Sequence, residues 1–314
     1  IAIKATGPGL PVNTPHIPLT RVALLARRPQ RVWHARRNLE MLLGLGLKIV
    51  LRKNWKLMFT SASQRKHSEY TKWLISKMDA VVATSAKGAA YLDVPATVVH
   101  HGIDPSQFCP ADKKIARSRL GLPNGRLIGC FGRVRHQKGT DVFVDAMLAN
   151  VANHPDIVGV ILGRATKEHT SFEQNLKSKI SKAGLSNRIR FYGEVTVDAI
   201  PEWYQALDLF IAPQRWEGFG LTPLEAMVCG VPVIATRVGA FEELIVDGET
   251  GRLVACDDVM AMSIALNDAL SNPETLPRWS TAARAHVALH FTLEKEADAL
   301  IEIYEALLRD AQAT

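Results

Sequence analysis

Cysteine, aromatic residues and long apolar runs are all scarce in this chain of 314 residues. Its four cysteines include no C-x-x-C pair, so the sequence indicates neither a disulfide framework nor a cysteine zinc site and favours a reducing, cytosolic compartment. The longest apolar stretch, residues 41–50, is interrupted by Lys48 and falls well short of the roughly 20 residues that span a bilayer. What remains is an ordinary globular composition, 47% hydrophobic and 22% charged, whose length suggests two domains.

Acidic residues are scarce in the first third of the chain, and this scarcity is the origin of the net charge of +7. Residues 1–104 hold 16 Lys and Arg against 5 Asp and Glu, which is +11, whereas the remaining residues carry −4. A positive electrostatic field of this kind gives information about binding partners rather than about the fold. It favours nucleic acid, anionic lipid or an acidic substrate as the partner.

The cations of this first third are interleaved with Trp33, Trp55 and the apolar run 41–50. They are Arg27, Arg28, Arg31, Arg36, Arg37, Arg52, Lys53, Lys56, Arg65 and Lys66. Cations beside aromatic residues are typical of an amphipathic surface that rests on an anionic bilayer. The alternative is that the charge only keeps the protein in solution.

Strand-like and helix-like segments alternate along the chain, which predicts parallel β-α-β units. The expected strands are 31–33, 56–59, 80–83 and 97–99, then 127–131, 157–163, 190–192, 209–212 and 233–236. The expected helices are 39–53 and 66–78, then 139–151, 172–183, 199–206, 222–229, 259–271 and 293–308. The second series of strands is apolar throughout, as in a sheet buried on both faces. We therefore expect two doubly wound α/β domains joined by a linker near 104–125.

The chain opens at Ile1, without Met, and residues 1–5 are predicted to be a strand already under way before the turn at 7–9. We therefore expect a segment that precedes this strand to be absent.

The loop after the first strand of the second domain has the features of a phosphate site. It reads Gly132-Arg-Val-Arg-His-Gln-Lys138-Gly139 and leads into a predicted helix, whose N-terminal amides and dipole favour anions. Arg133 can hold two phosphate oxygens in a fork, while Lys138 acts as a compact point charge. An ordinary basic surface loop is the alternative for this segment taken alone.

Two glutamates eight residues apart follow the predicted strand 209–212. Glu217 lies in a glycine-rich turn where nothing local requires an acid, and its carboxylate can accept hydrogen bonds from sugar hydroxyls. Glu225 lies where a T-x-x-E capping box is predicted, with Thr222 as N-cap and Pro223 as the first helical residue. Glu225 is therefore either a ligand-binding residue or only a helix cap.

These two segments, followed by Gly230-Val-Pro-Val-Ile-Ala and Asp247-Gly-Glu-Thr-Gly251, resemble the donor half of a retaining GT-B glycosyltransferase. The family resembled is the large nucleotide-sugar-dependent one with a glutamate-x7-glutamate motif (family 4 type). The match covers roughly 99–290, with four motifs in the family's order. The first half is similar to rhizobial-type lipopolysaccharide core mannosyltransferases in residues 33–38, 59–62, 71–74 and 101–104.

The resemblance implies a role for each site residue. Arg133 and Lys138 would hold the diphosphate of the donor, Glu217 would hold the donor hexose, and Glu225 the ribose. The other residues assigned to the donor are Gly218, Phe219, Gly220 and Leu221 at the helix entrance, and Tyr192 and Glu194 near the base. Arg36 and Arg37 would lie on the acceptor side.

The resemblance also implies the organisation of the chain. Residues 1–104 would form an incomplete acceptor-side domain, 105–290 the nucleotide-sugar donor domain, and 291–314 a C-terminal helix. The protein would bind a nucleotide sugar and an anionic lipid-linked saccharide, would require no cofactor, and would be cytoplasmic and peripheral on the inner membrane.

The implied reaction is the transfer of a hexose, mannose from GDP-mannose, onto a lipopolysaccharide inner-core acceptor. The anomeric configuration would be retained by front-side attack, in which the leaving phosphate accepts the acceptor proton and no protein nucleophile is required. The family works without a metal, and the sequence contains no D-x-D motif. Glucosyl or N-acetylglucosaminyl transfer from a UDP-sugar is the alternative, because the turn of Glu217 suits several hexoses.

Two departures from the family follow from the sequence. The family normally opens with a strand and a glycine-rich loop, so the resemblance implies that the first domain lacks its opening β-α unit. The other departure concerns histidine. Many relatives carry a His after the strand that corresponds to 56–59, where this chain has Thr60 and Ser61. A catalytic histidine is therefore not assigned to that position. The substitutes that the sequence offers without ranking are His34, His67 and His101, each of which is more often structural.

Three other classes of function compete with this interpretation. A nicotinamide dehydrogenase needs G-x-G-x-x-G directly after a strand, whereas Gly44-Leu-Gly46 lies inside a predicted helix. A nucleic-acid-binding protein would explain the basic first third, but the sequence has no known module for nucleic acid and its donor motifs would be unexplained. A non-catalytic sugar-nucleotide-binding remnant is the third alternative.

Overall fold

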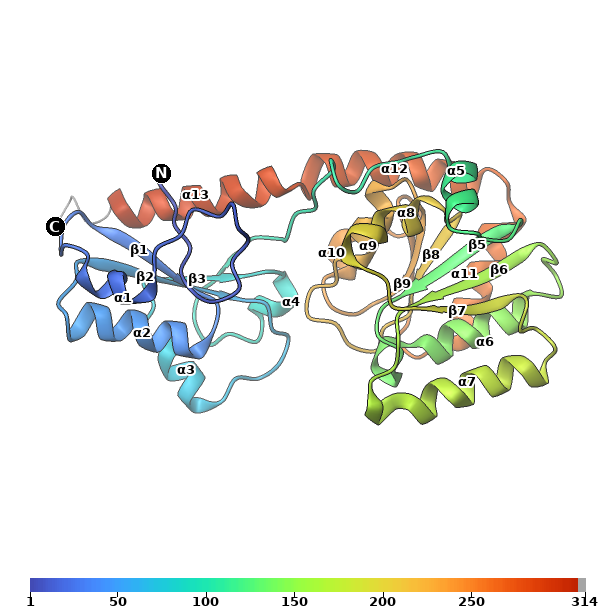
Figure 1. The fold of residues 1–314 in the computed structure, drawn as a ribbon, viewed down its shortest axis with the longest axis horizontal. Coiled ribbons are helices and arrows are strands. Elements are labelled where there is room, and N and C mark those ends of the chain that lie inside the picture. The colour runs from blue at the N-terminus through green and yellow to red at the C-terminus, as the bar shows by residue number, and fades with distance from the viewer. Residues whose placement is uncertain (310–314) are drawn as a thin grey trace. The chain divides into compact units, whose positions relative to one another are not determined.

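The computed structural model describes residues 1–309 and divides them into two compact units (Figure 1). The first unit comprises residues 1–100 together with the chain from Glu296 onward, and the second comprises residues 101–295. The last helix, α13 (Leu293–Arg309), therefore begins in the second unit and continues in the first. The end of the predicted C-terminal helix, 310–314, lies outside the described residues. No helix in residues 1–309 combines the length and apolarity that crossing a bilayer requires.

The first unit contains a parallel sheet of four strands in the order β1-β2-β3-β4. The strands are β1 (Arg31–Ala35), β2 (Trp55–Ser61), β3 (Ala80–Ala83) and β4 (Thr97–Val98). The helices are α1 (Leu19–Leu24), α2 (Asn38–Ile49), α3 (Glu69–Ile75) and α4 (Ala86–Ala89). The four predicted strands are confirmed. The strand expected over residues 1–5 is wrong, because Ala5 makes only an isolated bridge to His16.

Alternate residues of β2 point to opposite faces of this sheet and build two separate cores. On one face Leu57 packs with Met41 of α2 and Leu74 of α3. On the other face Met58 packs with Leu307 of α13. Figure 1 shows the same division, with α2 and α3 on one side of the sheet and α13 on the other.

Two tryptophans expected at a membrane surface are internal instead. Trp55 is 4% exposed, and Trp33 stacks on it with ring centroids 6.0 Å apart while its Nε1 donates to the carbonyl of Glu40 at 2.8 Å. Lys53 is also buried, and its ammonium donates to the carbonyl oxygen of Leu25. Trp55 and Lys53 therefore cannot belong to an interfacial surface, and Trp33 is only partly exposed.

His34 ties α13 to the sheet of the first unit. Its Nδ1 lies 2.6 Å from the hydroxyl of Tyr304 on α13, and its Nε2 lies 2.7 Å from the hydroxyl of Thr60 on β2. Burial, with a smaller contribution from the cation of Arg36, lowers the pKa of His34 to about 4. A neutral imidazole donates from one nitrogen and accepts at the other, which suits two hydroxyl partners. Both ring nitrogens are thus used in a structural contact.

We expect His34 to make the stability of the protein depend on pH. Because its folded pKa lies below the unfolded value of 6.5, protonation favours unfolding, so stability is intact above pH 6.5 and falls as the pH drops toward 4. Between pH 7 and pH 5 the loss should be about 2 kcal/mol. Chemical denaturation at both pH values measures it, and His34→Gln should remove most of the difference. An unchanged difference in the variant would contradict the assignment.

The second unit contains a parallel sheet of six strands in the order β10-β9-β8-β5-β6-β7. The strands are β5 (Arg126–Phe131), β6 (Ile157–Leu162), β7 (Ile189–Gly193), β8 (Leu209–Ala212), β9 (Val233–Thr236) and β10 (Gly251–Val254). The helices are α5 (Lys113–Arg119), α6 (Thr140–Asn150), α7 (Thr170–Lys182), α8 (Ile200–Gln205), α9 (Thr222–Val228), α10 (Phe241–Leu244), α11 (Val259–Ser271) and α12 (Thr275–His290). All five predicted strands are confirmed. The linker expected over 104–125 is wrong in part, because it contains α5.

The apolar strands of this sheet are buried on both faces, as their sequences predict. Every residue of β6 is buried. Val158 and Val160 belong to a core with Tyr204 of α8, whereas Ile157 and Ile161 belong to a second core with α6 and α7. Helices thus cover both faces of the sheet, and the loops that connect to them lie at the ends of the strands.

Candidate functional site

The two loops that carry the predicted donor residues follow the two central strands of the six-stranded sheet. From β5 the chain winds outward through β6 to β7, and from β8, the other neighbour of β5, it winds the opposite way through β9 to β10. In an open parallel sheet, ligands bind outside the carboxyl ends of the strands at such a switch point. Residues 132–139 and 213–221 therefore flank the expected position of a ligand.

Lys138 and Glu217 meet at this switch point. Lys138 ends the short helix η1 (His136–Lys138), and its Nζ donates a hydrogen bond to Oε2 of Glu217. Oε1 of Glu217 accepts from the backbone N–H of Gly218 at 3.1 Å. The two side chains are 22% and 17% exposed, so the pair is shielded yet reachable from solvent. A carboxylate suited to hydroxyl donors and an ammonium suited to anionic oxygens are thereby held side by side.

Glycine allows the two loops to come this close. Gly139 has a φ of 69°, and a Cβ atom there would lie 1.8 Å from the carbonyl oxygen of Pro213. Gly220 has a φ of 92°, and a Cβ atom there would lie 2.8 Å from Cγ of Glu217 and 2.3 Å from the ring of Phe241. A side chain at either position would displace the loop that carries Lys138 or Glu217.

Arg215 fastens three loops to one another. Its guanidinium forks onto the carboxylate of Asp141 in the first turn of α6, with both N–O distances at 2.8 Å. Its Nε donates to Asp257, which follows β10, at 2.8 Å, and Nη1 also donates to the carbonyl of His136 at 2.6 Å. The hydrogen bonds to Asp141 and Asp257 raise the pKa of Arg215 further above its ordinary value. The clamp therefore stays charged and fixes η1 beside the turn of Glu217.

Glu225 is not a helix cap, so the predicted capping box is wrong. Helix α9 begins at Thr222, its N-cap position is Leu221, and no side chain caps it. The carboxylate of Glu225 instead accepts a hydrogen bond at 2.8 Å from the hydroxyl of Tyr204 on α8. Burial raises the pKa of Glu225, and the hydrogen bond from Tyr204 opposes that rise only in part. Glu225 is thus a shielded acid with unused acceptor capacity.

Several buried polar atoms along this edge of the sheet lack a hydrogen-bond partner among the described residues. They are Nε of Arg135, Oη of Tyr192, Oε1 of Gln214 and Oγ1 of Thr222. Arg135 and Gln214 belong to the loops after β5 and β8, while Tyr192 and Thr222 lie at the end of β7 and the start of α9. Buried polar atoms are ordinarily paired, so unpaired atoms at one strand edge fit a site that a polar ligand completes.

The remaining predicted donor residues are spread along the same edge. Tyr192 packs edge-on against Trp203 with ring centroids 5.0 Å apart, and Glu194 is exposed and pairs with Arg164 at 2.7 Å. Gly218 and Leu221 flank the turn between Glu217 and α9, and the Phe219 side chain is 5% exposed. Arg133 is exposed in the loop after β5. Within residues 1–309, no hydrogen bond, ion pair or ring contact joins Tyr192 or Glu194 to the Lys138–Glu217 pair.

Arg36 and Arg37 lie in the first unit, exposed between β1 and α2. They follow the carboxyl end of the parallel strand β1, the edge at which sheets of this kind bind ligands.

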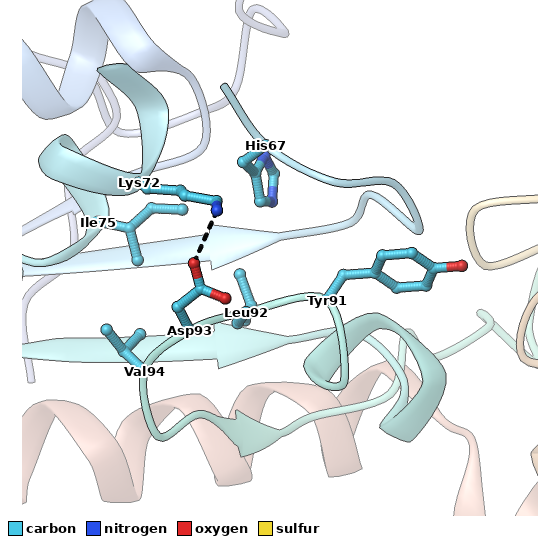
Figure 2. A pocket seen from close by; sticks show the side chains of 7 residues that line it. All are labelled: His67, Lys72, Ile75, Tyr91, Leu92, Asp93 and Val94. Carbon is cyan, nitrogen blue, oxygen red and sulfur yellow. Dashed lines mark ion pairs between the residues drawn. The ribbon is translucent and has the colours of Figure 1, made fainter. Parts of the chain in front are cut away.

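His67 lines a small pocket of the first unit (Figure 2). Figure 2 shows its ring near Lys72, which pairs with Asp93 at 3.0 Å. Burial, with a smaller contribution from the cation of Arg65, lowers the pKa of His67. The cavity volume of about 10 Å³ is that of a single water molecule, so the pocket cannot hold a sugar.

His101 belongs to the second unit and packs edge-on against Phe219, with ring centroids 5.0 Å apart. Its ring therefore supports the turn that follows Glu217. Of the three histidines that the sequence offers, it is the one that contacts this loop.

The structure also shows a spacious cavity at the opposite edge of the six-stranded sheet. Its volume is about 550 Å³, and it is lined by Arg126 at the start of β5 and by Asp208 and Pro232, which precede β8 and β9. Asp208 is already paired with Arg117 at 2.6 Å. Amino ends of strands are not where such sheets bind substrates, so cavity size does not indicate the site here.

The chain is similar to a known protein family over most of the second unit. Residues 112–286, more than half of the chain, match the family of group 1 glycosyl transferases. The protein belongs to this glycosyltransferase family. The matched segment begins just before α5, ends within α12, and includes both loops of the switch point.

Two curated relatives match this glycosyltransferase over almost its whole length. The lipopolysaccharide core biosynthesis mannosyltransferase LpsB of Rhizobium meliloti (strain 1021) is 51% identical, and the match covers 98% of this chain and 89% of the relative. The lipopolysaccharide core biosynthesis mannosyltransferase LpcC of Rhizobium leguminosarum bv. viciae is 48% identical, over 99% of this chain and 89% of the relative.

Solved structures confirm the GT-B fold that the sequence predicts. Alr3699/HepE of Anabaena, in complex with UDP, gives a TM-score of 0.81 at 21% identity and covers 91% of this chain and 81% of its own. The C-terminal domain of a group 1 glycosyl transferase, LpcC of Francisella tularensis, gives 0.59 at 34% identity over 61% of this chain and 100% of its own.

We expect Arg215→Ala to lower kcat for glycosyl transfer about 100-fold, because releasing the clamp moves Lys138 and Glu217 out of register. Arg117→Ala is the matched control. Arg117 is 19% exposed against 15% for Arg215, and it binds Asp208 at 2.6 Å and the carbonyl of Ala206 at 2.8 Å at the other edge of the sheet. Both variants should lose comparable stability in thermal unfolding.

Only Arg215→Ala should lose turnover beyond what its unfolded fraction explains. Equal losses of turnover in the two variants at a temperature where both are folded would show that Arg215 acts on stability alone.

Proposed function

We propose that this glycosyltransferase transfers mannose from GDP-mannose to an inner-core acceptor of lipopolysaccharide. The names of two relatives that match nearly the whole chain support both the sugar and the acceptor. The observation that carries the proposal is the pairing of Lys138 with Glu217 at the switch point of the sheet. A hexose joined to a diphosphate presents hydroxyl donors beside anionic oxygens, and this pair offers a partner to each.

The proposed reaction retains the anomeric configuration. The bond between the anomeric carbon and the phosphate oxygen breaks, the bond to the acceptor oxygen forms on the same face, and the acceptor proton passes to the departing phosphate. Lys138 and Arg133 stabilise the charge that develops on the diphosphate, while Glu217 orients the hexose. Glu217 already has Lys138 and an amide as partners, which suits a positioned acceptor of hydrogen bonds rather than a nucleophile.

In this proposal the rest of the nucleotide lies along the same strand edge. Glu225 accepts hydrogen bonds from the ribose hydroxyls, since its carboxylate has capacity beyond Tyr204. Tyr192 and Glu194 lie near the base, and the unpaired hydroxyls of Tyr192 and Thr222 gain partners from the ligand. No metal takes part, because cationic side chains neutralise the diphosphate.

The acceptor is an anionic lipid-linked saccharide, so the enzyme would work in the cytoplasm as a peripheral protein of the inner membrane. The net charge of +11 on residues 1–104 supports attraction to such an acceptor and to the anionic lipid around it.

The test is a panel of GDP-mannose, UDP-glucose and UDP-N-acetylglucosamine, offered with a lipopolysaccharide core acceptor with and without a chelator. We expect transfer from GDP-mannose alone, an α-linked product by NMR, and no effect of chelation. Preference for a UDP-sugar would show that the donor is a UDP-sugar instead of GDP-mannose. The structurally similar Anabaena protein was solved in complex with UDP. Donor binding without transfer would identify a binding protein, and strict dependence on Mg²⁺ or Mn²⁺ would contradict the metal-free reaction.

We expect Glu217→Ala to separate transfer from nucleotide binding. Removing a hydrogen bond to the reacting sugar should lower kcat on the order of 10² to 10³. Binding of GDP, which lacks the sugar, should be retained or strengthened, because Lys138 loses its carboxylate partner and becomes free for phosphate. Steady-state kinetics and calorimetric titration with GDP measure the two effects.

Glu173→Ala is the matched control for this variant. Glu173 is 19% exposed, forms a glutamate–lysine pair with Lys177 at 2.5 Å on α7, and accepts from the backbone N–H of Ala165 at 3.0 Å. Within residues 1–309 it makes no hydrogen bond or ion pair to Lys138 or Glu217. It should leave kcat unchanged. Wild-type turnover in folded Glu217→Ala protein would refute the assignment of Glu217.

A further inference from the structure

Helix α2 of the first unit is apolar on its outer side as well as on its inner side. Met41, Leu45 and Leu47 are buried against the sheet and α1. Leu39 is 78% exposed and Ile49 is 68% exposed on the side that faces away. A helix that is hydrophobic all round is normally buried in a protein core or in lipid. Among the described residues, nothing covers the outer side of α2.

Helix α3 extends this apolar surface. The side-chain amide of Asn38, at the start of α2, donates to the hydroxyl of Thr71 on α3 at 2.8 Å, which fixes the two helices side by side. On α3 the rings of Tyr70 and Trp73 stack with centroids 6.3 Å apart, and each residue is about half exposed. We define the docking face as the exposed apolar residues of these two helices: Leu39, Leu42, Ile49, Val50, Tyr70 and Trp73.

Cations surround the docking face at the ends of both helices. They are Arg36 and Arg37 before α2, Arg52 after it, Arg65 and Lys66 before α3, and Lys77 after it, and all six are exposed. None of them forms an ion pair within residues 1–309. Of the nearby acids, Glu69 pairs with Lys72 at 3.1 Å and Asp79 pairs with Lys48 at 2.7 Å, and Glu40 accepts the backbone N–H of Arg36 at 2.7 Å. We call these six residues the cationic rim.

We propose that the docking face and its cationic rim bind an anionic lipid bilayer, with the apolar side chains at the acyl boundary and the cations on the lipid phosphates. Apolar residues with Trp and Tyr inside a ring of Lys and Arg match the layering of a membrane interface. A second copy of this chain is a poorer partner. A two-fold contact through this face would bring two unpaired cationic rims together, and like charges at close range repel.

The inference rests on the proposed function in one respect only: that function identifies the anionic membrane as the one that contains the lipid-linked acceptor. The surface itself belongs entirely to the first unit, so its test does not require the donor to be known.

Vesicle flotation of the full chain tests the proposal. The probes are vesicles of phosphatidylcholine alone and of phosphatidylcholine mixed with phosphatidylglycerol, at low and high salt. We expect the wild type to float with the anionic vesicles at low salt only. Lys66→Glu with Lys77→Glu should lower the partition coefficient at least about 25-fold, because each cation near an anionic surface contributes about fivefold. Leu42→Ser with Trp73→Ser should lower it about tenfold or more by removing apolar burial.

Matched variants in the second unit serve as controls. Met260→Ser with Ile264→Ser changes two exposed apolar residues one turn apart on α11, which are 73% and 54% exposed. Lys167→Glu with Lys182→Glu changes two exposed lysines at the ends of the segment around α7. Binding that depends only on total charge would respond equally to both lysine pairs, and this outcome would overturn the proposal. Indifference of the wild type to lipid charge would do the same.

Two further measurements test whether misfolding or dimerisation explains a loss of flotation. Calorimetric titration of each variant with GDP, without vesicles, should give wild-type affinity, so a loss of flotation cannot be ascribed to misfolding or to the donor site. Light scattering should give the same mass for the wild type and for Leu42→Ser with Trp73→Ser. A wild-type dimer that this variant converts to a monomer would show that a second copy covers the face instead.

Discussion

The site at the switch point depends on a close approach between two loops that lie about 80 residues apart in the sequence. Lys138 and Glu217 can pair only because Gly139 lets the backbone after η1 lie against the carbonyl of Pro213. Taking a lysine and a glutamate partly out of water is costly unless each finds the other. Arg215 reinforces the approach by binding Asp141 and the carbonyl of His136 from the other loop. The charges are therefore positioned before any ligand arrives, which is what electrostatic preorganisation requires.

The two loops of the site are anchored on the central strands of the second unit. Strands β5 and β8 are neighbours at the centre of the six-stranded sheet, and they contribute to both buried cores of the second unit. Loops anchored on such strands keep their side chains within a narrow range of positions. The edge strand β7 carries Tyr192 and Glu194, whose surroundings are more open. The part of the site proposed for the diphosphate and sugar is thus more constrained than the part proposed for the base.

The sequence was sufficient for the features that depend on local pattern. Continuous apolar runs identified the strands of the second unit except β10, whose four residues Gly251–Val254 include a glycine and an arginine, and glycine-containing loops pointed to Lys138 and Glu217. It failed where distant residues compete with a local rule. The T-x-x-E pattern at Thr222 predicts a cap, but Tyr204 on α8 takes the carboxylate of Glu225 instead. The function of Arg215 depends on Asp141 and Asp257, which are 74 and 42 residues away. Trp55 could not be told from an interfacial residue because its burial depends on packing between separate segments.

The core of the first unit is completed by α13, the last helix of the chain to be synthesised. Leu307 completes the core around Met58 and Val82 of the first unit, although β3 leaves the ribosome more than 200 residues earlier. One face of the first sheet is therefore uncovered throughout the synthesis of the second unit. Exposed apolar sheet surface on a nascent chain is a target for chaperones and for aggregation. The second unit is continuous in sequence, so it can finish folding first and the N-terminal unit is closed last.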